Sequence, residues 1–367
     1  MALQIKPILP LDPKFRGHLG YSRWTICLGA GASTGVVPSW FELTRRLVNQ
    51  VFGSAFSDSE FKSQVSDQGW GLDSWIQACA NRHVLSGGTL AGFQNLIRDL
   101  LYADLLVEAR TAGVEDDLKA TIRWPRVSRR KQIETVCGFL DARYGKTTLI
   151  GLVKWLLAAN AKDKLPHAII SFNAEPLLHT VFELFQRREH YAGPPPHSGP
   201  RYRFTRILRP NLVPRDVSKD GEKVCIYHCH GALFPDLPKL KGSPREKLNN
   251  SLIFLEQDYL KVTSKSATWP ETLFMFHANL TRMVFIGMSM SDPNIRRWLG
   301  LSEELAASGQ ANRGVSQGPP HIWLTKKPTD LKAAEVNLTG LWHLGVRPAW
   351  FEKWDDLGPA LSNLTAV

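Results

Sequence analysis

The sequence predicts an α/β protein with a Rossmann-like, doubly wound parallel sheet and an inserted helical subdomain. Short apolar runs alternate with helical stretches, which is typical of parallel sheets with helices on both faces. Several runs end in glycine or a small polar residue, as strands do when they enter ligand-binding turns. The length of 367 residues exceeds that of a usual single domain and leaves room for an insertion.

The elements follow in order along the chain. The apolar run Trp24–Leu28 stops at Gly29, and Pro38 with the apolar spacing of residues 40–51 predicts a helix. Together they form the opening of a nucleotide-binding βα unit. Helical spacing then dominates residues 53–160. Further strands are predicted at Ala168–Phe172, Val224–Tyr227, Leu252–Leu255, Met283–Ile286 and His321–Leu324.

These patterns divide the chain into four parts. We predict an N-terminal arm at residues 1–22 and a discontinuous Rossmann domain at residues 23–52 and 161–350. Residues 53–160 are expected to form an inserted helical subdomain, and residues 351–367 a C-terminal tail with a closing helix. Residues 186–223 carry nine basic against four acidic side chains and many prolines, which predicts a loop outside the core.

Composition excludes several classes of protein. Hydrophobic residues make up 43% and charged residues 22%, as in globular proteins. Neither a leader nor a membrane-spanning run is apparent, and the five cysteines include no CxxC pair, so we expect a cytoplasmic protein without disulfides or membrane contact. The net charge of +11 fits either nucleic acid on a basic surface or a solvated surface with subunit contacts.

The loop Gly29-Ala30-Gly31-Ala32-Ser33 follows a predicted strand and precedes a helix. Backbone N–H groups and the helix dipole can hold a diphosphate in that setting, although glycines in such turns also serve packing alone. A second glycine motif, Gly145-Lys146-Thr147-Thr148, lacks the glycine spacing of a P-loop.

Polar residues follow three other predicted strands. Asn173 could orient a water or a ribose hydroxyl, or cap the next helix. His230 could act as a base or hold a ribose hydroxyl, or be structural. In the Gly287 turn, Ser289 could meet a phosphate or ribose, while Asp292 is expected to cap a helix.

The segment from Cys225 to His230 raises the question of a metal. Because side chains alternate along a strand, His228 and His230 should point one way and Cys225 and Cys229 the other. This arrangement disfavours a zinc site, and no metal is predicted.

The order of these motifs resembles the SIR2 (sirtuin) superfamily over about residues 23–52 and 166–347. The resemblance implies that NAD is the substrate, that Asn173 orients the attacking water and that His230 contacts the ribose hydroxyls or removes a proton. It further implies that NAD is held by Gly29, Ala30, Gly31, Ser33, Gly287, Ser289 and Asp292.

Departures from the protein deacylases of that superfamily are informative. The zinc module of two CxxC pairs is absent, Pro38-Ser39-Trp40-Phe41 replaces a Pro-x-Phe-Arg element, and Glu175 stands where an Asp is usual. The chain looks more like bacterial SIR2-like effectors of anti-phage defence, which hydrolyse NAD.

That resemblance implies an NAD+ glycohydrolase that releases nicotinamide and ADP-ribose, or a cyclised form, and depletes NAD. Because constant activity would kill the host, we expect a trigger: homo-oligomer formation, a HerA-like ATPase partner or nucleic acid. The alternatives are an NAD-dependent protein deacylase, and a non-catalytic module that binds NAD, ADP-ribose or nucleic acid.

Overall fold

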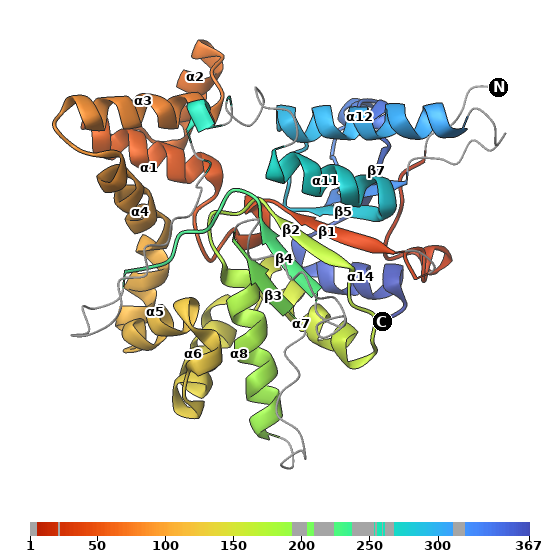
Figure 1. The fold of residues 1–367 in the computed structure, drawn as a ribbon, viewed down its shortest axis with the longest axis horizontal. Helices are drawn as coiled ribbons and strands as arrows, with labels where there is room; N and C mark the ends of the chain where they lie inside the picture. The colour runs from red at the N-terminus through yellow and green to blue at the C-terminus, as the bar shows by residue number, and fades with distance from the viewer. Residues whose placement is uncertain are drawn as a thin grey trace.

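The computed structural model describes residues 6–20, 23–192, 204–208, 224–236, 253, 255–258, 260, 268–310 and 320–367. Within them lies one seven-stranded parallel sheet (Figure 1), which confirms the predicted fold class. Its order is β3-β4-β2-β1-β5-β6-β7. In chain order, the strands are β1 Trp24–Leu28, β2 Ala168–Ser171, β3 Phe204–Ile207, β4 Val224–His228, β5 Arg282–Ile286, β6 His321–Lys326 and β7 Val346–Phe351.

The central strands are buried on both faces, as the continuous apolar runs require. In β1, Ile26 and Leu28 belong to one hydrophobic cluster and Cys27 to the other. In β5, Val284 and Phe285 divide in the same way. The sheet therefore separates two cores, and each core must be covered by helices.

Helices cover the two faces as a doubly wound sheet requires (Figure 1). On one face lie α11 Trp269–Leu280 and α12 Pro293–Gln310, whose Phe274 and Trp298 are fully buried. The other face is covered by α7 Thr148–Ala161, α8 Leu177–Ala192 and α14 Leu357–Thr365. The closing helix expected in the tail is thus present as α14, packed against α7.

Between β1 and β2 the described chain is helical. The helices before α7 are α1 Trp40–Phe52, α2 Asp58–Gln68, α3 Leu72–Leu85, α4 Leu90–Thr111, α5 Glu115–Arg123 and α6 Arg130–Tyr144. Their buried side chains form one continuous cluster with β1 and β2. The helical region is therefore packed onto the sheet through a shared core, while the predicted domain bounds stay a prediction.

One loop prediction and one strand prediction were wrong. Residues 186–223 do not all lie outside the core, because β3 runs through them with Phe204 and Ile207 fully buried, although 193–203 and 209–223 lie outside the described residues. The strand expected at Leu252–Leu255 is not found, because Ile253 and Leu255 are not in a strand. Residues 252 and 254 lie outside the described residues.

Strand β7 and the N-terminal arm form one edge of the sheet, and we did not predict this strand. Pro348 interrupts the apolar pattern of β7. Proline has no N–H to donate, and it is tolerated in an edge strand because some N–H positions there need no partner strand. Ile8 bonds to Pro348 and Trp350 through its backbone and covers the edge. No helix among the described residues is long and apolar enough to cross a membrane.

The strand order places a topological switch point beside β1. From β1 the chain proceeds to β2 and β4 on one side, and later to β5, β6 and β7 on the other. In the register, Leu28 lies between Ser171 and Ile286, so the carboxyl ends of β2, β1 and β5 are level. Ligands of open parallel sheets bind in the crevice at such a point.

Candidate functional site

A cavity of about 840 Å³ opens at the carboxyl ends of β1, β2, β4 and β5. All nine residues predicted for the site line it: Gly29, Ala30, Gly31, Ser33, Asn173, His230, Gly287, Ser289 and Asp292. The structure therefore brings together residues that are up to 263 positions apart in the sequence. Their roles toward a ligand remain predictions.

The two glycine loops touch each other at the switch point. The Gly29 N–H donates to the carbonyl of Ile286 at 3.0 Å, and the Gly31 N–H to that of Gly287 at 2.9 Å. A Cβ at Gly29 would lie 2.6 Å from the Gly287 oxygen, and one at Gly287 would lie 2.1 Å from the Ala32 nitrogen. The glycines are therefore required for the loops to meet, whatever they also do for a ligand.

One detail of the glycine loop differs from the prediction. The loop does not lead directly into a long helix but into the four-residue 3-10 turn Ala30–Ser33, and α1 begins only at Trp40. Ser39 caps α1 by accepting from the Glu42 N–H at 3.2 Å. In this turn the N–H groups of Gly31 and Ala32 already donate to the carbonyls of Gly287 and Gly29, so a diphosphate at Gly29–Ser33 would meet only the other N–H groups of the turn. The N-terminus of α1 forms another part of the wall.

Three polar side chains form a buried network at the bottom of the crevice. Ser33 Oγ donates to Glu175 Oε1 at 2.5 Å, and Asn173 Nδ2 donates to both Ser33 Oγ at 3.2 Å and Glu175 Oε1 at 3.0 Å. Asn173 and Glu175 are 5% and 4% exposed, and Ser33 is 1% exposed. Asn173 Oδ1 is buried and has no partner among the described residues. It is an acceptor that a ligand hydroxyl or a water would satisfy.

Glu175 also accepts a hydrogen bond from the first residue of helix α8. Its Oε2 accepts from the Leu177 N–H at 2.5 Å. Burial raises its pKa to about 7, against the opposing hydrogen bonds from Ser33, Leu177 and Asn173. Capping of this helix, which was the alternative role for Asn173, is therefore supplied by Glu175, and Asn173 Oδ1 stays without a partner among the described residues.

His230 lies in the turn after β4, with its ring edge-on to Phe172 at 5.0 Å between centroids. Burial lowers its pKa to about 4, so the imidazole is neutral at pH 7. A neutral imidazole offers one donor and one acceptor nitrogen.

The prediction that His228 shares a side with His230 was wrong. Strand β4 ends at His228, so the alternation of side chains stops before His230. His228 is buried near His179 of α8 and does not line the cavity. The described residues contain no group of three His, Cys, Asp or Glu side chains arranged to hold a metal.

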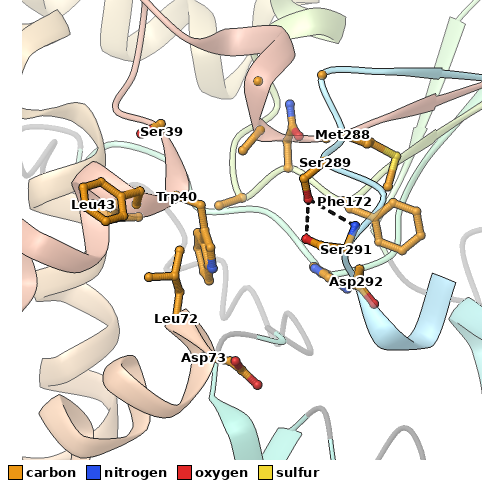
Figure 2. A pocket seen from close by; sticks show the side chains of 18 of the residues that line it. Ser39, Trp40, Leu43, Leu72, Asp73, Phe172, Met288, Ser289, Ser291 and Asp292 are labelled. Atoms are coloured by element: carbon orange, nitrogen blue, oxygen red, sulfur yellow. Dashed lines mark hydrogen bonds between the residues drawn. The ribbon is translucent and has the colours of Figure 1, made fainter. Parts of the chain in front are cut away.

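The loop after β5 forms the facing wall. Ser289 Oγ and Ser291 Oγ are 2.6 Å apart (Figure 2), and Asp292 Oδ1 caps α12 by accepting from the N–H groups of Asn294 and Ile295 at 2.8 and 3.2 Å. Met290 has a φ of 58°, a strained conformation often found at binding sites. The cap predicted for Asp292 is thus present, and Ser289 remains available to a ligand.

The helical region contributes a wall that the sequence did not predict. Trp40 from α1 and Leu72 and Asp73 from α3 lie across the cavity from the Ser289–Asp292 loop (Figure 2). Trp40 belongs to the motif at residues 38–41 that follows the glycine loop. Leu72 and Asp73 begin helix α3, and no sequence motif marks them as site residues. Only the packing of α3 on α1 brings them to the pocket.

Fold and pocket together define a Rossmann-like α/β protein with a cavity at its switch point. A family model described as a SIR2-like domain matches residues 167–344, which include Asn173, His230 and the Gly287 loop. Residues 167–344 therefore form a SIR2-like domain, and SIR2-like domains use NAD as a substrate. No curated protein matches the chain.

Proposed function

We propose that this protein is an NAD+ glycohydrolase that cleaves the nicotinamide-ribose bond and releases nicotinamide and ADP-ribose. The observation that carries the proposal is the buried acceptor Asn173 Oδ1, which shares one cavity with a neutral His230 and both glycine loops. A sugar hydroxyl or the attacking water supplies the donor that Asn173 lacks.

The chemistry requires little acid catalysis. As the bond breaks, its electron pair leaves with nicotinamide, which becomes neutral, and positive charge develops on the ribose. Water then forms the new bond to the same carbon and loses a proton to solvent. With a pKa of about 4, His230 is a weak base. We therefore propose that His230 forms a hydrogen bond to a ribose hydroxyl and does not act as the general base that removes the proton from water.

The test is incubation of the protein with NAD and chromatographic detection of nicotinamide. We expect release from NAD alone once the protein is in its active assembly. Release that requires an acylated peptide would instead identify a deacylase. Thermal stabilisation by NAD with no product, in the isolated chain and in every assembly tried, would identify a binding module and contradict the hydrolase.

The proposal includes control of the activity from outside the chain, because unchecked hydrolysis of NAD would kill the cell that makes it. Formation of a homo-oligomer, a HerA-like ATPase or nucleic acid on the basic surface would be the trigger, in a bacterial anti-phage defence role. Assays should therefore compare the purified chain, its oligomeric fractions and added DNA. The net charge of +11 supports the inclusion of DNA.

The pocket predicts a preference for NAD over NADP. Its described lining includes the carboxyl groups of Asp73, Glu175, Glu256 and Asp292, and no lysine or arginine. The extra phosphate of NADP would add two negative charges to this acidic surrounding without a cation to pair with. We expect at least about tenfold lower kcat/KM for NADP, a difference of about 1.4 kcal/mol. Equal kcat/KM for both nucleotides would contradict this effect of the pocket's charge.

A further inference from the structure

Glu175 is a buried carboxyl whose burial has no explanation in helix capping alone. A cap requires one oxygen, and Oε2 provides it to the Leu177 N–H. The other oxygen, Oε1, accepts from both Ser33 and Asn173. Burial of a carboxylate is unfavourable unless its hydrogen bonds compensate, so a purely structural cap would be served as well by an exposed Ser or Asp.

The network fixes which way the Asn173 amide points. Glu175 Oε1 and Ser33 Oγ each take a hydrogen bond from Nδ2, so the amide nitrogen is held on their side. Ser33 can accept from Asn173 because it donates its own proton to Glu175. Rotation of the amide by half a turn would place Oδ1 against two acceptors, which is repulsive.

We propose that Glu175 is a positioning residue: its carboxylate, directly and through Ser33, holds the Asn173 amide so that Oδ1 is the acceptor left for the ligand. This inference rests on the proposed function for its effect on turnover. The orientation of the amide, however, is a property of the protein without ligand and can be measured separately.

Glu175→Gln tests the proposal because the substitution keeps size and removes the charge. The Gln amide must turn an N–H2 group toward either the Leu177 N–H or the Nδ2 of Asn173, so one donor faces another. We expect turnover at pH 8 to fall about tenfold or more, mainly in kcat, while Glu175→Asp recovers part of it. A Gln variant as active as the wild type would overturn the proposal.

Glu183→Gln is the matched control. Glu183 is also a fully buried glutamate of this region, but it lies on α8 and does not line the cavity. Its carboxylate pairs with Arg126 and lies beside His179. Burial alone would raise the pKa of Glu183, but its interactions with His179 and Arg126 outweigh burial and lower that pKa. Its loss should therefore reduce stability at neutral pH and leave turnover unchanged.

Stability separates positioning from a structural role. The pKa of Glu175 is about 7 when folded, above its usual 4.5, so its contribution to the free energy of unfolding falls as pH rises from about 4.5 to 7. Relative to Glu175→Gln, the wild type should therefore lose melting temperature between pH 5 and 8, while it stays the more active of the two. A variant that loses melting temperature and turnover together would favour a structural role.

Titration provides the measurement that does not require turnover. Two titratable neighbours in this region do not titrate near pH 7, because burial places the pKa of Tyr102 of α4 well above its usual value and lowers that of His230 to about 4. Burial also raises the pKa of Asp292, a carboxyl on the facing wall of the cavity, against the hydrogen bonds of its cap, and Glu175→Gln separates its effect from that of Glu175. The side-chain amide resonance of Asn173, identified by its loss in Asn173→Ala, should shift with a midpoint near pH 7 and not do so in Glu175→Gln.

The two measurements distinguish the possible failures. If nicotinamide is never released but the amide of Asn173 follows the titration of Glu175, the proposed function fails and the positioning role stands. If nicotinamide is released but the amide does not respond between pH 5 and 9, the positioning role fails alone.

Discussion

Asn173→Ala should lower the rate of nicotinamide release by about 100-fold or more, a larger loss than we expect for Glu175→Gln. The substitution removes the buried acceptor Oδ1 together with both hydrogen bonds of Nδ2. Chromatographic assay over a range of NAD concentrations should show the loss in kcat more than in KM, because the effect is on the reacting geometry.

The control for this substitution is Asn81→Ala. Asn81 is exposed on α3, where its Oδ1 accepts from Gln77, and it does not line the cavity. It should retain full activity. Melting curves and ADP-ribose binding of Asn173→Ala show whether its fold and pocket survive, and a well-folded variant with unchanged turnover would remove Asn173 from the site.

The fold was predictable because its signals are local. Residues 24–28 and 283–286 are apolar runs that end at glycine, and both are strands with the bounds that the pattern indicates to within one residue. Strand β3 was hidden because arginines and prolines surround it, and burial of Phe204 depends on α8 packing against it. Such a strand is defined by its neighbours more than by its own sequence.

The site residues also fall into two groups, those with a local sequence signal and those defined by contacts between distant segments. Gly29, Asn173, His230 and Gly287 stand at strand ends, where the parallel sheet brings them together automatically. Glu175 was recognised only as a departure from an expected Asp. Its bonds to Ser33, 142 positions away, could not be read from one sequence.

Gly287→Ala should destabilise the protein more than any of the substitutions proposed above. Gly287 has a φ of 68°, which an L-residue adopts only with strain, and its Cβ would lie 2.1 Å from the backbone nitrogen of Ala32. The clash is with backbone, so no side chain can rotate away from it. We expect a decrease of about 3 kcal/mol or more in the free energy of unfolding, measured by chemical denaturation, because strain and overlap add.

Gly53→Ala separates the two causes. Gly53 ends α1 with a φ of 65°, nearly the same as that of Gly287, but a Cβ there would meet no atom within 4 Å. Its substitution should cost about 1 kcal/mol, from backbone strain alone. The difference between the two variants then measures the contact between the loops after β1 and β5. Equal losses would mean that these loops can move apart, and that the pocket they form is not held by the glycines.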